Sequence, residues 1–402
     1  MDITLKDIQE ARRCLKNIAY KTGLVHNTTF SEMAENNVYL KTENLQKTGS
    51  FKVRGAFNKI AHLSEKDKKN GVIASSAGNH AQGVAMAATA YKIKSTIVMP
   101  KHAPLSKIAA TKSYGAEVVL HGDVYDEAYE KAREIQSKTG AVFVHPFNDL
   151  KVIAGQGTIG IEILEDLPDV DIIAVPIGGG GLISGIAVAA KSIKPDIKII
   201  GVQTKNMPSM IQSISHNHIT SVDSMPTIAD GIAVKTPGEL TFKIIKHYVD
   251  DIVTVDEDEI ANAILLWLER AKVISEGAGA ASIAAILNRL EHINNKKIVA
   301  LVSGGNIDVN MLSRIIDKGL AKSGRKIFID TLIQDRPGTL GILLNLMAET
   351  GANVLSIIHN RSTGDIPIGY AKVELELETA DEEHVEKIKR LLSLKGYSFS
   401  LL

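Results

Sequence analysis

Between Asn37 and about Pro195, short β-rich runs alternate with segments of helical pattern, and this alternation limits the fold more than any other feature. Strands separated in this way form parallel sheets, because each intervening helix returns the chain to begin the next strand in the same direction. The β-rich runs are residues 37–43, 71–76, 95–100, 116–122, 141–147 and 171–178, and the helical runs are 51–70, 80–92, 104–115, 124–140 and 152–168. Further strands are expected at 197–203 and 296–305, with helices at 259–274 and 277–290 between them. We therefore predict an α/β fold with an open parallel sheet.

The end of the chain follows a different pattern. Its segments predict the order β-α-β-β-α-β at residues 327–333, 339–350, 353–360, 370–378, 381–396 and 397–402. In the fourth segment, Val373, Leu375 and Leu377 alternate with charged residues, which is typical of a strand with one buried face. We predict a small ferredoxin-like unit at 327–402, separate from a larger unit at 1–322.

Charge and cysteine content exclude several classes of protein. The chain has 46 basic and 46 acidic residues, so no net charge attracts nucleic acid or an anionic membrane. Cys14 is the only cysteine, which excludes an intrachain disulfide and a cysteine zinc cluster. The uncharged stretch 172–190 contains Pro176 and the glycine run 178–181, which would break a membrane-spanning helix. We expect a cytoplasmic protein with no nucleic-acid or membrane partner.

The first candidate for chemistry is Lys52, in the motif at residues 46–56. Ser50 can cap a helix that begins at Phe51, which places Lys52 in the first helical turn. A partly buried lysine beside the positive end of a helix binds its proton less tightly, which suits a Schiff-base lysine. The alternative is a solvated surface lysine, as most lysines are.

The second motif occupies residues 74–83, where a β-rich run ends in serines, a glycine turn follows and a helix starts. Backbone N–H groups at such a turn can bind an anion, in this case a substrate carboxylate. Asn79 adds an amide that can donate to an oxyanion; the alternative is an ordinary helix cap. The candidate substrate-binding residues are Ser75, Ser76, Ala77, Gly78 and His80.

Two further motifs follow predicted strands. The four glycines at 178–181 leave room for the backbone to wrap a phosphate at the start of a helix. The run does not match G-x-G-x-x-G, so a phosphate monoester is favoured over NAD. Ser303 and Asn306 lie at the end of another strand, where open α/β sheets gather ligand groups, although turn residues are common there too.

Taken together, K-T-G-S-F-K-V-R-G-A, S-A-G-N-H-A-Q-G, G-G-G-G-L and S-G-G-N resemble, in order and spacing, one family. It is the threonine dehydratase (threonine ammonia-lyase) branch of the fold-type-II pyridoxal-phosphate enzymes. The resemblance covers roughly residues 1–320 and implies a two-lobed, tryptophan-synthase-β-like fold with the smaller lobe inserted at about 40–145. It implies pyridoxal 5'-phosphate as cofactor. The implied reaction is deamination of L-threonine to 2-oxobutanoate and ammonia, with side activity on L-serine.

The resemblance also assigns roles to the motif residues. Lys52 would form the Schiff base with the cofactor and remove the Cα proton of the substrate. Phe51 would pack against the cofactor ring, Asn79 would bind its ring oxygen and Ser303 would face its pyridine nitrogen. A serine hydroxyl does not hold that nitrogen protonated as a carboxylate does, which suits elimination. The phosphate would be held by Gly178, Gly179, Gly180, Gly181 and Leu182.

Two departures from the family pattern narrow the expectation. Members that racemise serine carry a serine where Ala77 stands, and Ala77 has no proton to give. Members with a divalent-metal site carry two carboxylates after the matching strand, whereas this chain has Gln203 and Ser209, so no metal site is predicted. A weak binding site for a monovalent cation near Glu276 is one alternative, and a structural role for Glu276 in capping the turn at 277–280 is another.

The tail, with Asp335, Pro337 and Gly338 at its first strand-to-helix turn, resembles an ACT regulatory domain. Proline fixes the loop, glycine lets a ligand approach the backbone, and the helix start can hold a carboxylate. The resemblance implies isoleucine or valine as an allosteric effector, a role in isoleucine biosynthesis or threonine breakdown, and a homo-oligomer, dimer or tetramer. The alternative is a dimerisation module that binds no ligand.

Three other functions stay open. A serine-preferring dehydratase with a purely structural C-terminal domain fits the same motifs. A nicotinamide oxidoreductase would have to explain the incomplete dinucleotide motif. A non-catalytic amino-acid sensor would have to explain why four cofactor motifs are intact.

Overall fold

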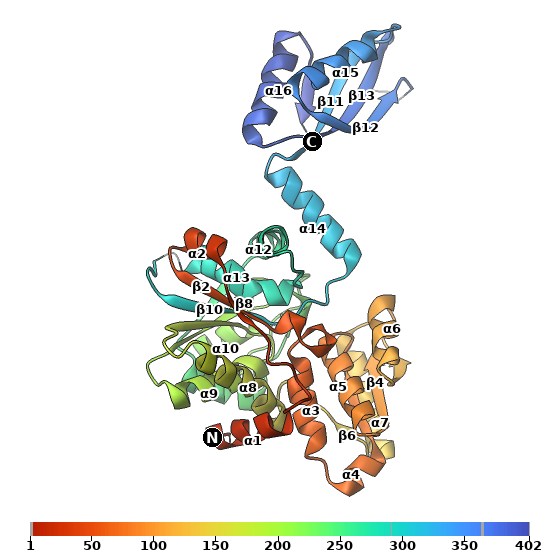
Figure 1. Cartoon of the computed structure of the whole chain (residues 1–402). Helices are drawn as coiled ribbons and strands as arrows, with labels where there is room; N and C mark the ends of the chain where they lie inside the picture. Colours follow the sequence, from red (N-terminus) through yellow and green to blue (C-terminus); the bar gives the residue numbers. More distant parts are fainter. Residues whose placement is uncertain (1–2, 291, 363–365, 402) are drawn as a thin grey trace. The chain divides into compact units, whose positions relative to one another are not determined.

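The computed structural model describes residues 3–290, 292–362 and 366–401, which form two compact units (Figure 1). The first unit is Met1–Asp308 and the second is Val309–Leu402. Within the described ranges, every helix is too short or too polar to cross a lipid bilayer. The uncharged stretch at 172–190 is a strand followed by a separate helix.

The first unit is built on a six-stranded sheet with the order β1-β2-β10-β7-β8-β9. Its strands are β1 (Leu24–His26), β2 (Asn37–Thr42), β7 (Ile172–Pro176), β8 (Lys198–Thr204), β9 (Asp251–Val255) and β10 (Lys297–Val302). All neighbours are parallel except β1, which runs antiparallel to β2 at the edge. Because Val302 pairs with Thr42, the segments that leave β2 and β10 begin side by side.

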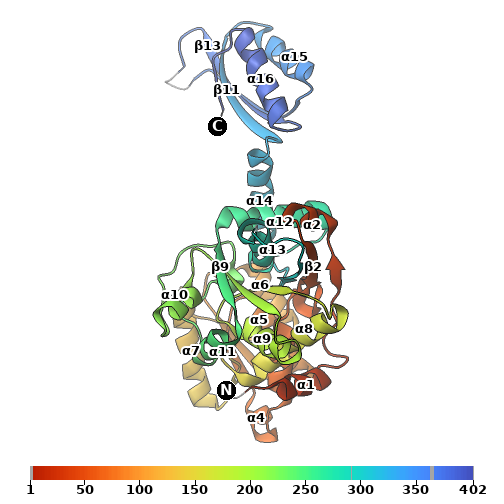
Figure 2. The ribbon, with the colours of Figure 1, turned by 90° about the vertical axis from the view of Figure 1, so that its left-hand side faces the viewer.

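Helices cover both faces of this sheet (Figures 1 and 2). One side carries α2 (Thr28–Ala34), α12 (Glu257–Ala271) and α13 (Gly277–Arg289). The other carries α1 (Leu5–Cys14), α8 (Leu150–Asp166), α9 (Gly181–Ile193), α10 (Ser209–His216) and α11 (Glu239–Tyr248). Strands covered on both faces are apolar throughout, and all five residues of β7 are buried.

A smaller lobe of the same unit contains a four-stranded parallel sheet with the order β5-β4-β3-β6. Its strands are β3 (Val72–Ser75), β4 (Ser95–Met99), β5 (Glu117–Leu120) and β6 (Val142–Phe143). Its helices are α4 (Glu65–Asn70), α5 (Asn79–Ala90), α6 (Leu105–Ser113) and α7 (Tyr125–Thr139).

Helix α3 (Lys52–Ala61) lies between the lobes, packed on α5 of the smaller lobe and α8 of the larger one. Two glycines permit this close packing. A Cβ at Gly83 of α5 would lie 3.2 Å from backbone atoms of Lys52, and one at Gly155 of α8 would lie 2.5 Å from the Arg54 carbonyl oxygen. The start of α3 is therefore held from both sides.

The second unit begins with α14 (Val309–Lys322) and continues as an antiparallel sheet with the order β12-β13-β11-β14. Its elements follow the chain as β11 (Lys326–Gln334), α15 (Thr339–Thr350), β12 (Asn353–Asn360), β13 (Tyr370–Glu378), α16 (Glu382–Leu394) and β14 (Phe399–Leu401). Ile327, Ile329 and Ile333 of β11 alternate into a core shared with both later helices. The expected β-α-β-β-α-β order is the observed one.

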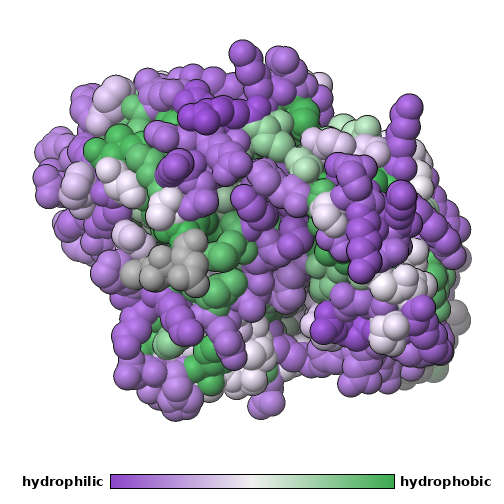
Figure 3. Space-filling model, turned by 90° about the horizontal axis from the view of Figure 1, so that it is seen from below, coloured by the Kyte–Doolittle hydropathy of each residue, from purple (hydrophilic) through white to green (hydrophobic). Residues whose placement is uncertain are grey.

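The α/β fold with two parallel sheets and a small antiparallel C-terminal unit is confirmed. Strand β9 was not expected from the sequence, because its residues are mostly half-exposed at the sheet edge and form no continuous apolar run. Hydrophilic side chains dominate the face seen in Figure 3, where apolar atoms appear in separate areas. The larger apolar clusters lie inside the lobes.

Candidate functional site

Lys52 is the first residue of α3, and the residue that precedes the helix, Phe51, makes no side-chain cap. The expectation that Ser50 caps this helix is wrong. Ser50 is in extended conformation and forms an isolated bridge with Gly304. Its hydroxyl is buried and has no hydrogen-bond partner in the described structure.

The amine of Lys52 is crowded by protein. Its Nζ donates to the carbonyl oxygen of Pro146 at 3.2 Å and lies 5.1 Å from the centre of the Phe51 ring. Loss of solvent around the ammonium group lowers the pKa of Lys52 to about 8, although the negative charge of Glu276 opposes this shift. The lowered pKa gives this amine a larger neutral fraction near physiological pH than an ordinary lysine has, which suits a Schiff-base lysine.

The lysine, asparagine and serine motifs meet at the carboxyl ends of β2 and β10. The Phe51 N–H donates to the Ser303 carbonyl oxygen at 3.2 Å. The side-chain amide of Asn306 donates to the Thr48 carbonyl oxygen and to Asn79 Oδ1, both at 2.7 Å. Three segments distant in sequence are therefore joined around Lys52.

The glycine run at 178–181 packs against the loop that contains Phe147. A Cβ at Gly179 would lie 2.3 Å from the Phe147 ring, so no other residue fits this position. Thr241 donates its hydroxyl proton to the Gly179 carbonyl oxygen at 2.6 Å, which orients that peptide. Within the described residues, the backbone N–H groups of 178–182 donate to no backbone carbonyl, so they are available to an anion at the start of α9.

The serine turn lies between β3 and α5. Ser75 is buried, and its hydroxyl has no partner among the described residues, whereas the Ser76 hydroxyl accepts from the Gly78 N–H at 3.2 Å. His80 is buried and its Nε2 is 2.7 Å from the Val144 carbonyl oxygen. Burial and the nearby charge of Lys52 lower the pKa of His80 to about 3, so this imidazole stays neutral. Ala77, beside Gly78, adds no proton donor.

Glu276 directly precedes α13, but its side chain makes no cap hydrogen bond, which corrects one of the two roles considered for it. Its carboxylate Oε1 instead accepts from the side-chain amide of Asn79 at 2.7 Å, and only its backbone carbonyl accepts from Ala280. No sequence motif connects Glu276 with Asn79, because the two are 197 positions apart. Pro146, Phe147 and Thr241 were missed for the same reason: no motif marks them.

Gln203 has a structural role. Its Oε1 accepts the backbone N–H groups of Met210 and Ile211 at 3.0 and 2.9 Å, which stabilises the first turn of α10. In the described ranges, His, Cys, Asp and Glu side chains form no group of three that could hold a metal ion.

In the second unit, Asp335 forms an ion pair with Arg361 at 3.0 Å, and its backbone N–H donates to the Gly369 carbonyl oxygen. Gly338 precedes α15 with a φ of 91°, and a Cβ there would meet no atom within 4 Å. The turn that contains Pro337 is therefore open at the start of α15.

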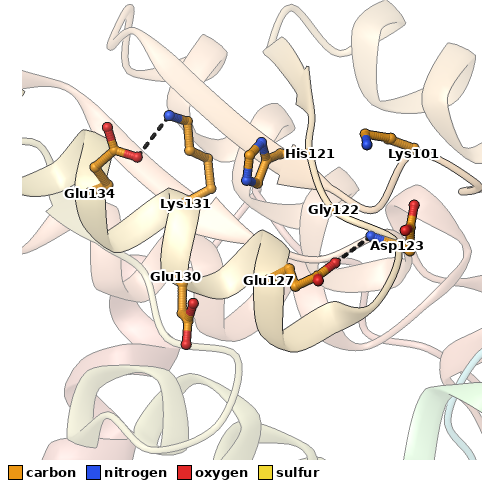
Figure 4. Close-up of a pocket in the computed structure, with 8 residues that line it drawn as sticks. All are labelled: Lys101, His121, Gly122, Asp123, Glu127, Glu130, Lys131 and Glu134. Carbon is orange, nitrogen blue, oxygen red and sulfur yellow. Dashed lines mark hydrogen bonds and ion pairs between the residues drawn. The ribbon is translucent and has the colours of Figure 1, made fainter.

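A surface hollow of about 630 Å³ lies along α7 and shares no residue with the motifs (Figure 4). Its lining is charged, with Lys131 paired to Glu134 and the Glu127 carboxylate accepting the Asp123 N–H. These pairs occupy Lys131, Glu134 and Glu127, and we assign the hollow no role in catalysis.

Comparison with known proteins gives consistent results. The family model described as "Pyridoxal-phosphate dependent enzyme" matches residues 15–304. An L-threonine ammonia-lyase of Thermotoga maritima is 62% identical over 400 residues, which cover 100% of both chains. A catabolic L-threonine dehydratase of Escherichia coli K12 is 50% identical over 317 residues, or 78% of this chain and 96% of the relative. The structure of maize serine racemase matches with a TM-score of 0.75 and 36% identity over 80% of this chain and 99% of that one.

The fold and the matched region define a fold-type-II enzyme that depends on pyridoxal phosphate. Within that class, the chain belongs to the L-threonine ammonia-lyase family. The resemblance drawn from the four motifs is thereby confirmed, as is the cofactor that it implied.

The residues present fit this cofactor. A phosphate needs unpaired N–H donors, which residues 178–182 offer at the start of α9, where a Cβ at Gly179 or Gly181 would collide with Phe147. An aldehyde reacts with a neutral amine, and the lowered pKa of Lys52 raises the neutral fraction of its amine. The buried, unpartnered hydroxyl of Ser75 lies at the end of β3, on the same motif as Asn79.

Proposed function

We propose that this chain deaminates L-threonine to 2-oxobutanoate and ammonia by loss of water, with side activity on L-serine. The main observation behind the proposal is that three motifs meet around the Lys52 amine, whose pKa is about 8. The chain is also 62% identical to a threonine ammonia-lyase over its full length. Pyridoxal phosphate, when bound, supplies the electron-withdrawing ring that makes the Cα proton acidic.

The residues of the chain divide the work between binding and proton transfer. The N–H groups of 178–182 hold the phosphate, and Phe51 packs against the ring. Asn79 donates to the ring oxygen and Ser303 faces the pyridine nitrogen. Lys52 Nζ would hold the cofactor covalently and, as a free amine, would accept the Cα proton. The turn at 75–80 holds the substrate carboxylate.

We propose that the second unit is a regulatory module that binds isoleucine or valine at the turn with Asp335, Pro337 and Gly338. The sheet of this unit exposes Phe328 and Leu332, and its edge strand β12 exposes further apolar side chains. An exposed apolar edge strand is a surface that other chains cover. A second copy of the chain is the occupant that we propose, which makes the protein a homo-oligomer.

Oxo-acid release from L-threonine and L-serine tests the catalytic proposal. Full-length protein with pyridoxal phosphate should release 2-oxobutanoate from threonine and pyruvate, more slowly, from serine. Faster release from serine would favour the serine-preferring alternative. A colourless protein that releases neither acid would contradict the proposed function.

A further inference from the structure

Glu276 is a buried carboxylate at the meeting point of the site motifs, with 4% of its surface exposed. Two glycines make room for it. A Cβ at Gly304 would lie 2.2 Å from Glu276 Oε1, and a Cβ at Gly231 would lie 3.4 Å from it. The chain therefore accommodates a charged group that makes no helix cap, and burying such a group is costly unless it is paired.

The Glu276 carboxylate stands at the end of a series of side-chain hydrogen bonds. Asn306 donates to Asn79 Oδ1, and Asn79 donates from Nδ2 to Glu276 Oε1, both at 2.7 Å. With a donor on one side and an acceptor on the other, the Asn79 amide has only one satisfactory orientation. Its second Nδ2 proton stays available for another acceptor.

The charged groups around Glu276 come from three other elements. Lys52 lies at the start of α3 and Lys107 on α6; Asp230 lies on η3 (Asp230–Ile232). Burial and the like charge of Asp230 raise the pKa of Glu276 to about 7, while Lys107, the Asn79 amide and Lys52 act to lower it. Lys107 and Asp230 also pair with each other at 2.6 Å. Asn79 is the hydrogen-bonding neighbour from α5.

We propose that Glu276 is a positioning residue of the catalytic site, whose carboxylate orients the Asn79 amide and whose negative charge acts on the Lys52 ammonium group. The first effect rests on the hydrogen-bond chain. The second follows from reciprocity: each of two coupled groups changes the proton affinity of the other by the same factor. The ionised Glu276 carboxylate favours the Lys52 ammonium group, and loss of that negative charge favours the free amine.

This inference deepens the proposed function and rests on it for the roles of Lys52 and Asn79. Its first test uses the full-length chain before the cofactor is added, so that the result does not depend on the substrate. The rate at which an amine-acylating reagent labels Lys52 is measured by peptide mass spectrometry across neutral and alkaline pH. Glu276→Gln keeps the size and the acceptor but removes the charge, so the pKa of Lys52 should fall and labelling near neutral pH should become several-fold faster.

Two controls make the result specific. Glu257→Gln removes another hydrogen-bonded carboxylate of the same unit. Glu257 accepts hydrogen bonds from Thr204, Thr227 and Ile228 and is not among the groups that shift the pKa of Lys52, so this variant should leave the Lys52 titration unchanged. Lys107→Met removes a charge that lowers the pKa of Glu276, so Glu276 should hold its proton to higher pH. An unchanged Lys52 titration in Glu276→Gln overturns the electrostatic part, whether or not wild-type protein acts on threonine.

The orientation of Asn79 has its own readout. Binding of pyridoxal phosphate is followed by fluorescence for Glu276→Gln and Glu276→Ala. The glutamine oxygen can still accept from Asn79, whereas alanine cannot, so the alanine variant should lose affinity for the cofactor and the glutamine variant should keep most of it. Equal affinities in all three proteins would overturn the positioning role.

Discussion

At the scale of single residues, the proposed site centres on one lysine whose pKa is lowered. Lys52 is only partly exposed, and the crowding of its amine lowers its pKa to about 8. Its contact with the Pro146 carbonyl oxygen places the amine over the Phe51 ring. These properties suit the covalent attachment and the proton acceptance that we propose for this side chain.

Replacing Lys52 by alanine should abolish turnover, because the covalent link and the proton acceptor are lost together. The measurement is oxo-acid release from threonine, with borohydride reduction of the protein to trap any lysine–cofactor adduct. Wild-type protein treated in parallel is the control. An adduct that persists in Lys52→Ala would assign the covalent role to another lysine.

Ala77 should commit the site to elimination, because one face of the reacting carbon then has no proton donor. Wild-type protein should make little D-serine from L-serine relative to pyruvate, and chiral chromatography of the products measures the ratio. The similarity to a serine racemase structure makes this test decisive, since the two activities share the fold. Comparable amounts of D-serine and pyruvate would contradict the prediction.

At the scale of elements, α3 is anchored by a buried network of four charged side chains. Arg54 on α3 donates to Glu43 and to Glu162, at 2.8 and 2.6 Å. Lys41 of β2 donates to Glu162 Oε2 at 2.6 Å. The two positive and two negative charges balance within the network, so α3 is tied to β2 and α8 two residues after Lys52.

Glu43→Gln should destabilise the fold by about 3–5 kcal/mol at neutral pH, because it leaves Arg54 under-compensated in the interior. Burial alone would raise the pKa of Glu43, but the charge and hydrogen bonds of Arg54 outweigh it and the pKa is lowered. The stability that Glu43 contributes is therefore present above its unfolded pKa and lost as pH falls through its lower folded pKa. Urea unfolding should show the gap between wild type and variant closing at acid pH; a gap that is constant or widens would contradict this.

At the scale of the whole molecule, the two units have separate cores and can be tested separately. The Escherichia coli relative matches 317 residues, or 78% of this chain, over 96% of its own length, so a related protein lacks a counterpart to part of this chain. The turn at Asp335 and the exposed face of the second unit are then candidates for a role in regulation rather than in catalysis.

A chain ending at Lys322 should keep threonine deamination but lose its response to isoleucine or valine. An effector must bind one global state better than another, with a coupling of about 1–3 kcal/mol. Calorimetry and kinetics on the full and shortened chains measure this. If neither amino acid binds the full chain or changes its kinetics, the second unit is a structural module.

The sequence alone determined the parallel α/β architecture, the β-α-β-β-α-β tail and the presence of four cofactor motifs, because these features depend on local patterns of apolar residues and glycine. Strand β9 could not be predicted from such patterns, since an edge strand with half-exposed residues has no distinctive period.

Only the tertiary structure decided which distant groups share a hydrogen bond. Glu276 stands before a helix, where sequence logic makes it a cap, yet the fold turns its carboxylate to Asn79, 197 positions away. Ser50 likewise stands where a cap belongs, but it pairs with Gly304 and its hydroxyl caps nothing. The local sequence indicates which interactions a residue is able to make. Its burial and its neighbours, which determine its pKa and its hydrogen-bond partners, are fixed only when strands from both ends of the unit come together in one sheet.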